Sequence, residues 1–262
     1  MKEDVSRWFL HPYVETLFGG SFHPGGLALS ETLALRAEVR AGERVLDVGC
    51  GTGGTAIRLA HRIGCRVDGI DGSVPLIDAA SARAEREGVA GQVTFVAGRA
   101  EFLPWPDNAF HAVLMESSYV FLDDPEAALS EACRVLAPPG RIGILEVAVA
   151  ARTPSALRRR LMEHVGAGAE PGTEAAYREA LHDAGFVRIQ WTDEGPALVR
   201  FLKELRGKLG LARMVLPALP PELRSIDLDA VQEDLDAGIQ LVEREEITLG
   251  TFIARKGKKA GA

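Results

Sequence analysis

The chain has 262 residues, of which 47% are hydrophobic and 26% are charged, and its formal net charge is −7. This composition is typical of a globular protein and excludes a chain that is disordered throughout. The acidic balance argues against a general nucleic-acid binder, which needs a basic surface to meet phosphates. The length fits one α/β domain with insertions.

The sequence lacks the signals of a membrane or secreted protein. It contains no apolar run of about 18 residues, which a membrane-spanning helix would need, and the opening MKEDVSRWFLHPY has no apolar segment of the kind found in secretory signals. The three cysteines, Cys50, Cys65 and Cys133, form no CxxC pair. We therefore expect a cytoplasmic protein with three buried thiols, no disulfide framework and no metal site.

Taken in chain order, the hydrophobic pattern predicts alternating strands and helices. Residues 1–41 are expected to form two helical pieces around the break FGGSFHPGG. The expected strands are 44–48, 65–70, 92–97, 111–116, 140–149, 187–192 and 246–256. The expected helices are 55–63, 75–88, 174–186 and one that begins at Pro125 with Asp124 as its N-cap. This alternation predicts a doubly wound, mostly parallel sheet with helices on both faces.

The alternation is interrupted late in the chain, where 196–245 contains two helical stretches before the last strand. We expect a single domain, 1–262, with 1–41 as N-terminal lid helices and 42–195 as its core. The stretch 196–245 is then a helical cap insertion, and 246–256 is the last strand. Lid and cap are expected at the carboxyl edge of the sheet, where open α/β sheets bind their ligands.

The stretch VLDVGCGTGGTAIRLA predicts a strand, a glycine-rich turn and a helix. Gly49 and Gly51 are followed by Gly53 and Gly54, so the turn fits both G-x-G-x-G and G-x-G-x-x-G. Such glycines allow a sharp turn and bring backbone N–H groups close to a ligand. Asp71, at the end of the next strand, can accept both ribose hydroxyls. The turn and Asp71 predict a nucleoside-containing ligand and leave NAD and S-adenosylmethionine open.

Asp47 distinguishes between these two ligands. It lies two residues before the first glycine, where the strand enters the turn. A carboxylate there would repel a pyrophosphate, whereas it would attract a ligand that carries an ammonium and a sulfonium. The alternative is that Asp47 only caps the turn by accepting hydrogen bonds from backbone N–H groups. Asp47 thus favours S-adenosylmethionine, and an NAD-dependent oxidoreductase is the less favoured alternative.

Four segments together resemble the class I S-adenosylmethionine-dependent methyltransferases that act on small molecules. VLDVGCGTGG matches their first motif and VDGIDGS their second. GRAEFLPWPDNAFHAVLMES resembles their G-D-A-x-x-L-P-F-x-D-x-S-F-D segment, and EACRVLAPPGRIGI resembles their R-V-L-x-P-G-G turn. These segments cover 43–146 in the order and spacing of the family. The resemblance implies a Rossmann-like sheet of seven strands whose last strand is antiparallel, and methyl transfer to a small-molecule acceptor.

The resemblance also implies which residues contact the cofactor. It assigns the methionine end to Asp47, Gly49, Cys50, Gly51 and Glu116, the ribose to Asp71, and the adenine to Gly72, Arg99, Ala100 and Glu101. Arg99 departs from the family, which has an acceptor there for the adenine amino group, because arginine only donates. We expect the N–H of Ala100 and the carboxylate of Glu101 to serve the adenine instead.

Gly72 is a second departure, because many members carry an apolar side chain there against the adenine. Phe102, Leu103 or Trp105 could supply this apolar area, although core packing is the expected role of at least two of them. These departures support an alternative function, a catalytically idle cofactor-binding protein or partner subunit.

Transfer of a methyl group from a sulfonium is a direct displacement, so it depends on placing the nucleophile in line. Glu116 and Tyr119, which follow the fourth strand, are candidate catalytic residues. The segment LFGGSFHPGGLALSETL resembles the F-x-x-G-G entry of methyltransferases of small amines, including phosphoethanolamine methyltransferases. By that likeness Tyr13 and His23 are acid–base candidates from the lid. The alternative is a Gly/Pro-rich connector with a solvated His23.

The late helices leave two further questions open. The stretch 199–215 is basic and amphipathic, so it either packs on the sheet or forms a lid that meets a carboxylate or phosphate of the acceptor. The helix after it is acidic on its outer face, which either a cap helix or a homodimer contact would explain. We expect a small-molecule acceptor as partner, and neither nucleic acid nor a membrane.

Overall fold

The computed structural model describes residues 10, 23–155, 170–215 and 227–257. Its centre is a seven-stranded sheet in the order β3-β2-β1-β4-β5-β7-β6. The strands are β1 (Arg44–Val48), β2 (Arg66–Asp71), β3 (Val93–Ala97), β4 (Phe110–Glu116), β5 (Leu136–Val149), β6 (Phe186–Asp193) and β7 (Ile247–Lys256). Only β7 runs against its neighbours, β5 and β6. The predicted fold class and the antiparallel last strand are confirmed.

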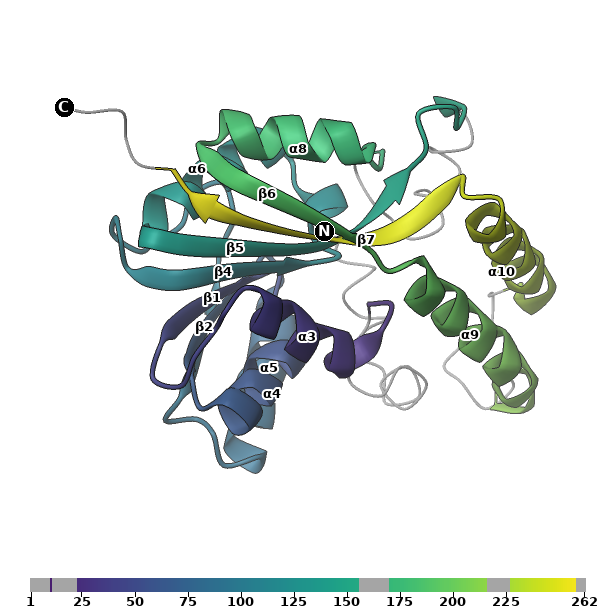
Figure 1. Ribbon diagram of the computed structural model, residues 1–262. Coiled ribbons are helices and arrows are strands. Elements are labelled where there is room, and N and C mark those ends of the chain that lie inside the picture. The colour runs from purple at the N-terminus through teal and green to yellow at the C-terminus, as the bar shows by residue number, and fades with distance from the viewer. Residues whose placement is uncertain (1–9, 11–22, 156–169, 216–226, 258–262) are drawn as a thin grey trace.

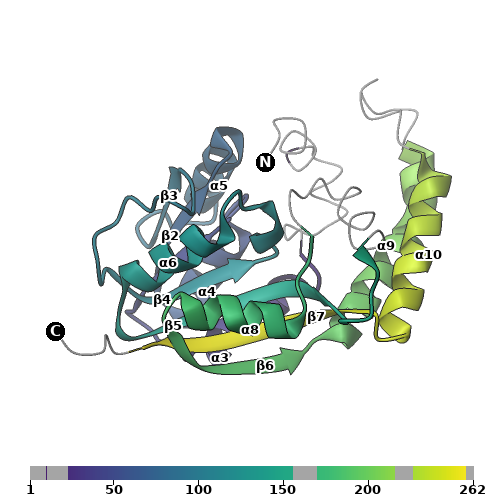
Figure 2. The same ribbon diagram turned by 90° about the horizontal axis from the view of Figure 1, so that it is seen from above.

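Helices cover both faces of this sheet (Figures 1 and 2). One face carries α3 (Gly26–Arg36), α4 (Gly54–Ile63) and α5 (Val74–Arg86), and the other carries α6 (Pro125–Val135) and α8 (Glu174–Asp183). A short 3-10 helix, η1 (Tyr119–Phe121), follows β4. Asp124 accepts a hydrogen bond from the N–H of Ala127 at 3.0 Å, so the predicted N-cap of α6 is confirmed.

The strand pleat sends neighbouring residues of β1 to opposite faces. Val45 packs into the apolar cluster beneath α3 and α4. Leu46 and Val48 belong to the cluster on the α6 and α8 face. Asp47 therefore projects towards the α3 and α4 face, although its strand is apolar and buried. This places a carboxylate in the interior, next to the turn that leads into α4.

The sheet order also brings the predicted site together. From β1 the chain extends outward through β2 and β3 on one side, and through β4 and β5 on the other. The direction of strand addition reverses between β1 and β4, which is where open α/β sheets bind ligands beyond the carboxyl ends of their strands. β2, β1 and β4 are parallel neighbours, so their carboxyl ends lie at the same edge.

The start of β5 differs most from the prediction, whereas the other strand boundaries agree within one residue. β5 begins at Leu136 rather than at residue 140, because Leu136 already pairs with Phe110. The register then shifts before Ala112 pairs with Arg141. Two prolines, Pro138 and Pro139, lie in this irregular stretch and have no N–H to donate to the ladder, which is typical of a bulge.

The late insertion contains two helices, α9 (Gly195–Val215) and α10 (Leu228–Glu243), which extend beyond the sheet (Figure 2). α9 follows β6, which is parallel to β5, so it leaves from the carboxyl edge. Three ion pairs join the two helices: Lys203–Glu243 at 3.5 Å, Arg206–Asp236 at 2.7 Å and Arg213–Asp229 at 2.6 Å. Within the described ranges, no helix combines the length and the apolar character needed to cross a membrane.

Candidate functional site

The clearest sign of a binding site is a group of buried polar atoms without hydrogen-bond partners. Among the described residues, every such side-chain atom lies at or just beyond the carboxyl ends of β1, β2 and β4. These atoms are Asp47 Oδ2, Ser73 Oγ, both carboxylate oxygens of Glu116 and Ser117 Oγ. A buried polar atom without a hydrogen bond is costly, so their concentration marks a place for a polar ligand. Asp47 and Glu116 were predicted from the sequence, whereas Ser73 was not.

The carboxylates at this edge act on one another. Asp47 is 2% exposed. Its pKa is raised well above the usual range, first by burial and then by the negative charges of Glu116 and Asp71. A cation at this edge would relieve both the repulsion and the loss of hydration. Asp47 also accepts a hydrogen bond from the N–H of Ala56 in α4, as the capping interpretation requires, but Oδ2 has no such partner.

The glycine-rich turn uses its backbone donors internally. The N–H groups of Gly49 and Cys50 donate to the carbonyl oxygen of Ile70, at 2.8 and 3.1 Å. The N–H of Gly51 donates to Asp71 Oδ2 at 3.0 Å. A turn that holds a pyrophosphate directs such N–H groups at the phosphate oxygens. Here they fix the end of β2 and the ribose-binding candidate Asp71, which agrees with a ligand whose binding does not depend on phosphate.

Glycine is required at position 49 for two reasons. Its φ is +76°, and a Cβ there would lie 2.5 Å from the Cβ of Ser118. Ser118 is itself held in place, because its hydroxyl donates to the carbonyl oxygen of Val48 at 3.0 Å. By contrast, a Cβ at Gly51 or Gly72 would meet nothing within 4 Å. These two predicted cofactor residues border open space at the same edge.

Asp71 is held in one orientation by backbone donors. Besides the N–H of Gly51, it accepts from the N–H of Ser73 at 2.9 Å through its other oxygen. Burial nevertheless raises the pKa of this carboxyl, and the two N–H groups only partly offset that effect. Each carboxylate oxygen keeps a further lone pair. Asp71 can therefore still accept from a pair of ligand hydroxyls.

The predicted adenine residues lie in the loop after β3. Ala100 is buried. Glu101 accepts from the N–H groups of Asp123 and Asp124 at 3.0 and 3.2 Å, just before α6. Arg99 is partly exposed, with Nη2 2.8 Å from Asp123 Oδ2 and Nε 3.4 Å from Glu101 Oε2. Glu101 thus already has partners for both oxygens, and its contact with an adenine stays a prediction.

The structure separates the three apolar candidates in this loop. Leu103 is buried, and the Trp105 ring packs edge-on against Phe110, with centroids 5.3 Å apart. Phe102 is 75% exposed. Of the three side chains, Phe102 is the one available to a ligand. The predicted core packing of the other two, Leu103 and Trp105, is confirmed.

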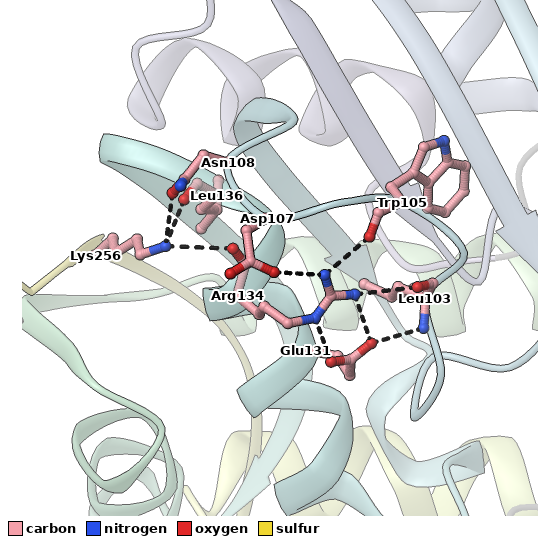
Figure 3. A network of polar contacts seen from close by, with 8 residues as sticks. All are labelled: Leu103, Trp105, Asp107, Asn108, Glu131, Arg134, Leu136 and Lys256. Carbon is pink, nitrogen blue, oxygen red and sulfur yellow. Dashed lines mark hydrogen bonds and ion pairs between the residues drawn. The ribbon is translucent and has the colours of Figure 1, made fainter.

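A polar network from α6 holds this loop in place (Figure 3). Arg134 donates to the carbonyl oxygens of Leu103 and Trp105, at 3.1 and 2.9 Å. The same guanidinium pairs with Glu131 at 2.6 Å and with Asp107 at 2.9 Å. Arg134 is the arginine of the predicted R-V-L segment, so that segment positions the loop rather than contacting a ligand itself.

His23 comes to the site from the N-terminal segment. Its Nε2 lies 3.3 Å from Glu116 Oε2, and its ring is buried. Ser30 of α3 hydrogen-bonds His23 Nε2 at 3.0 Å and Thr55 of α4 at 3.1 Å. The interpretation of His23 as a solvated connector residue is therefore wrong. The other lid candidate, Tyr13, lies outside the described residues.

Tyr119 follows the end of β4 and is the first residue of η1. Its ring packs against Tyr177 of α8, with centroids 5.1 Å apart. Burial first, then the negative charges of Glu126 and Glu146, raise the pKa of its phenol. The phenol therefore stays protonated near neutral pH and can donate a hydrogen bond, but it is a poor base. Its catalytic role stays a prediction.

Glu146 was not predicted from the sequence. It is fully buried in β5 and accepts from the N–H groups of Tyr119 and Val147, at 3.0 and 2.9 Å. Burial raises the pKa of this carboxyl to about 7, even though the N–H groups lower it. The available signal was one acid inside the apolar run ILEVAV. Glu146 fixes the backbone of the loop that carries Ser117, Ser118 and Tyr119.

Comparisons with known proteins identify the chain as similar to methyltransferases. A family model described as a methyltransferase domain matches residues 45–140. The chain is 36% identical to methyltransferase GfsG of Streptomyces halstedii over 124 residues, which cover 47% of this chain and 45% of GfsG. It is 32% identical to the O-methyltransferase rstn1 of Aspergillus nomiae over 166 residues, or 63% of this chain and 73% of rstn1. The chain thus spans less than half the length of GfsG.

Other relatives differ in what they are named for. Some are named for N-methylation of phosphoethanolamine or of sarcosine and dimethylglycine, and others for C-methylation of sterols. Among solved structures, the [4+2]-cyclase SpnF superimposes with a TM-score of 0.77 at 25% identity, over 97% of this chain and 96% of SpnF. The family is therefore clear, while the acceptor varies among its members.

We predict that Arg134→Met loosens the loop after β3. The substitution removes the donors to the Leu103 and Trp105 carbonyl oxygens and leaves Glu131 with the N–H of Leu103 but without its cationic partner, so the free energy of unfolding should fall by about 1–3 kcal/mol. Hydrogen exchange of the amides in 101–107 should become faster. Arg178→Met is a matched control, because Arg178 pairs with Glu174 and donates to the Ile189 carbonyl in the same way on α8. If both variants changed exchange in 101–107 equally, Arg134 would have no special role there.

We also predict a pH dependence of stability from Glu146. Its carboxyl holds a proton more tightly when folded, with a pKa of about 7 against 4.5 when unfolded. The stability contributed by that proton is complete below pH 4.5 and is lost as the pH rises towards 7, for a change of about 3 kcal/mol. Urea unfolding of wild type and Glu146→Gln between pH 4.5 and 8 isolates this change in their difference. A difference that does not vary with pH would contradict the assignment.

Proposed function

Because the chain belongs to the class I S-adenosylmethionine-dependent methyltransferases, we propose that it transfers a methyl group from S-adenosylmethionine to a small-molecule acceptor. The observation that carries the proposal is the set of buried, mutually repelling carboxylates at one sheet edge. S-adenosylmethionine supplies a methyl group on a cationic sulfur, next to an ammonium group. Asp47 and Glu116 would hold this cationic end, and Asp71 would accept from the ribose hydroxyls.

The residues present fit this ligand better than a dinucleotide. Asp47 Oδ2 and both oxygens of Glu116 lack hydrogen bonds, so they can accept from a cationic donor without giving up another partner. The N–H groups of Gly49, Cys50 and Gly51 already have acceptors, so they offer nothing to a pyrophosphate. A diphosphate here would also face three carboxylates. These points disfavour an NAD-dependent oxidoreductase.

The protein contributes to the reaction by positioning the cofactor and the acceptor and by excluding water. The loop after β3, held by Arg134, and the loop after β4, held by Glu146, fix the two sides of the site. A displacement needs the acceptor atom in line with the methyl group and little else. A base is needed only if the acceptor must lose a proton near the moment of attack. His23 is the described candidate for that task, and Tyr13 remains one by resemblance.

We propose that the segments 1–41 and 196–245 act as lid and cap within one domain, 1–262. In α10 the three residues that pair with α9 are Asp229, Asp236 and Glu243, which repeat every seven positions. They therefore share one helix face. Because α9 uses this acidic face, the pairs support a cap hairpin over a homodimer contact. They also account for three basic residues of α9 without a phosphate or a membrane.

The location of the protein is a further part of the proposal. All three cysteines are free, and Cys50 and Cys65 are buried. Free thiols are typical of the reducing cytoplasm, so we infer a cytoplasmic enzyme. The net charge of −7 supports an acceptor other than a nucleic acid.

The test exposes the purified protein and methyl-labelled S-adenosylmethionine to a metabolite extract. We expect label in one small product. Label found only in protein or RNA would contradict the small-molecule acceptor. Cofactor binding without any transfer would instead indicate an idle binding protein or partner subunit.

A variant pair tests the placement of the cofactor. Asp71→Asn leaves a single acceptor oxygen to serve two backbone N–H groups and the ribose hydroxyls. The Kd for S-adenosylhomocysteine should therefore rise about 10- to 100-fold. Asp68→Asn is the matched control, because Asp68 lies on the same strand but pairs with Arg44 at 2.6 Å. Calorimetric titration measures both. Equal affinities in the two variants would show that Asp71 does not contact the cofactor.

A further inference from the structure

We infer that the buried hydroxyl of Ser117 binds the carboxylate of the cofactor's methionine end, beside the Glu116 carboxylate that is proposed to bind its ammonium. This inference rests on the function proposed above and adds to it a residue and the ligand group that this residue recognises. It concerns the binding and orientation of the cofactor rather than a step in methyl transfer.

The methionine end of S-adenosylmethionine is a zwitterion, so it needs hydrogen-bond donors as well as acceptors. Asp47 and Glu116 can accept from its ammonium group, because both are buried acids with oxygens that lack hydrogen bonds. The same two acids would repel the ligand carboxylate, which is bonded to the same carbon as the ammonium. A carboxylate that leaves water needs donors in exchange. A cofactor site of this charge therefore needs a donor close to the ammonium partner.

Most donors at this edge of the sheet already have acceptors. The N–H groups of the glycine-rich turn, residues 49–51, donate within the protein. The Ser118 hydroxyl donates to the carbonyl oxygen of Val48. Two buried hydroxyl oxygens, those of Ser73 and Ser117, have no hydrogen-bond partner among the described residues. Because a hydroxyl hydrogen can rotate towards an acceptor, either serine can donate to a ligand.

Ser117 is the one of these two serines that lies next to the proposed ammonium partner. The ammonium and the carboxylate of the ligand share one carbon, so the groups that bind them must be neighbours. Ser117 directly follows Glu116 at the end of β4. Ser73 belongs to the ribose side instead, because its N–H donates to Asp71 at 2.9 Å. Position therefore favours Ser117 over Ser73 as the partner of the ligand carboxylate.

The backbone of Ser117 leaves the hydroxyl as the donor of this residue that a ligand can use. Its N–H already donates to the carbonyl oxygen of Leu145 in β5, at 2.8 Å. Its φ is +48°, a conformation that glycine adopts more easily than serine. Ser117→Gly therefore removes the hydroxyl while it suits the backbone, so this variant separates a loss of binding from a loss of folding.

The test compares two ligands that differ only in the carboxylate. S-adenosylhomocysteine carries this group, whereas decarboxylated S-adenosylhomocysteine lacks it and keeps the ammonium, the ribose and the adenine. Calorimetric titration gives the Kd of each ligand for wild type, Ser117→Gly and Ser117→Ala. In both variants the Kd for S-adenosylhomocysteine should rise roughly 10- to 100-fold, because a hydrogen bond to a charged group is lost. The Kd for the decarboxylated ligand should change less than about twofold, because the lost hydroxyl has no carboxylate to bind in it.

Ser118→Ala and Ser73→Ala are the matched controls, because each also loses one serine hydroxyl at this edge. Neither should weaken S-adenosylhomocysteine more than the decarboxylated ligand. Thermal unfolding should show that Ser117→Gly is no less stable than wild type. If Ser117→Ala fails to fold, Ser117→Gly still decides.

Equal changes of Kd for the two ligands in the Ser117 variants would overturn the inference. A selective loss of S-adenosylhomocysteine in Ser118→Ala or Ser73→Ala, absent from the Ser117 variants, would overturn it as well. Wild type that binds neither ligand would contradict the proposed function itself. Wild type that binds both ligands, together with Ser117 variants of unchanged affinity, would contradict only this inference.

Discussion

The structure depends on one electrostatic constraint, the burial of carboxylates at the ends of three neighbouring strands. The order β2-β1-β4 places Asp71, Asp47 and Glu116 at one edge of the sheet, where the charges of Asp71 and Glu116 raise the cost of ionising Asp47. Carboxylates in such a position are stable only with positive or donating neighbours. The backbone N–H groups around Asp71, the Ala56 N–H on Asp47 and His23 beside Glu116 supply part of that need. A cationic ligand would supply the remainder.

The glycine-rich turn has a different role from the one that its pattern suggests. Its N–H groups donate to the end of β2 and to Asp71, so the turn orients the residue proposed to bind the ribose instead of directing those N–H groups at a phosphate. Glycine is needed at position 49, where φ is positive and the backbone approaches Ser118, whereas Gly51 borders open space. The choice between ligands then follows from charge: the same backbone beside three carboxylates selects against a diphosphate and for a cation.

The sheet could be predicted from the sequence because each short apolar strand and each capped helix is a local pattern. Asp47 could be identified because it lies two residues before the first glycine of the turn, where a carboxylate would meet the ligand. The partners of buried groups could not be predicted in the same way, since they come from distant segments. Glu146 accepts a hydrogen bond from a backbone N–H 27 positions away, and His23 meets Glu116, which lies 93 positions later in the chain. Three basic residues of α9, Lys203, Arg206 and Arg213, looked available to a ligand, whereas α10 supplies their counter-ions.

The division of the chain explains how one fold can serve varied acceptors. Asp47, Asp71 and Glu116 all lie within the matched methyltransferase domain, at the edge of the parallel strands. His23 lies before that domain, and Glu146, α9 and α10 lie after it. The cofactor side of the site is therefore built on rigid strand ends, where small displacements would disrupt the carboxylates. The described part of the proposed lid, α3, packs into the core beside α4, whereas much of the proposed cap, α9 and α10, extends beyond the sheet (Figure 2). The sequence of that outer part can therefore change with the acceptor while the electrostatics of cofactor binding stay intact.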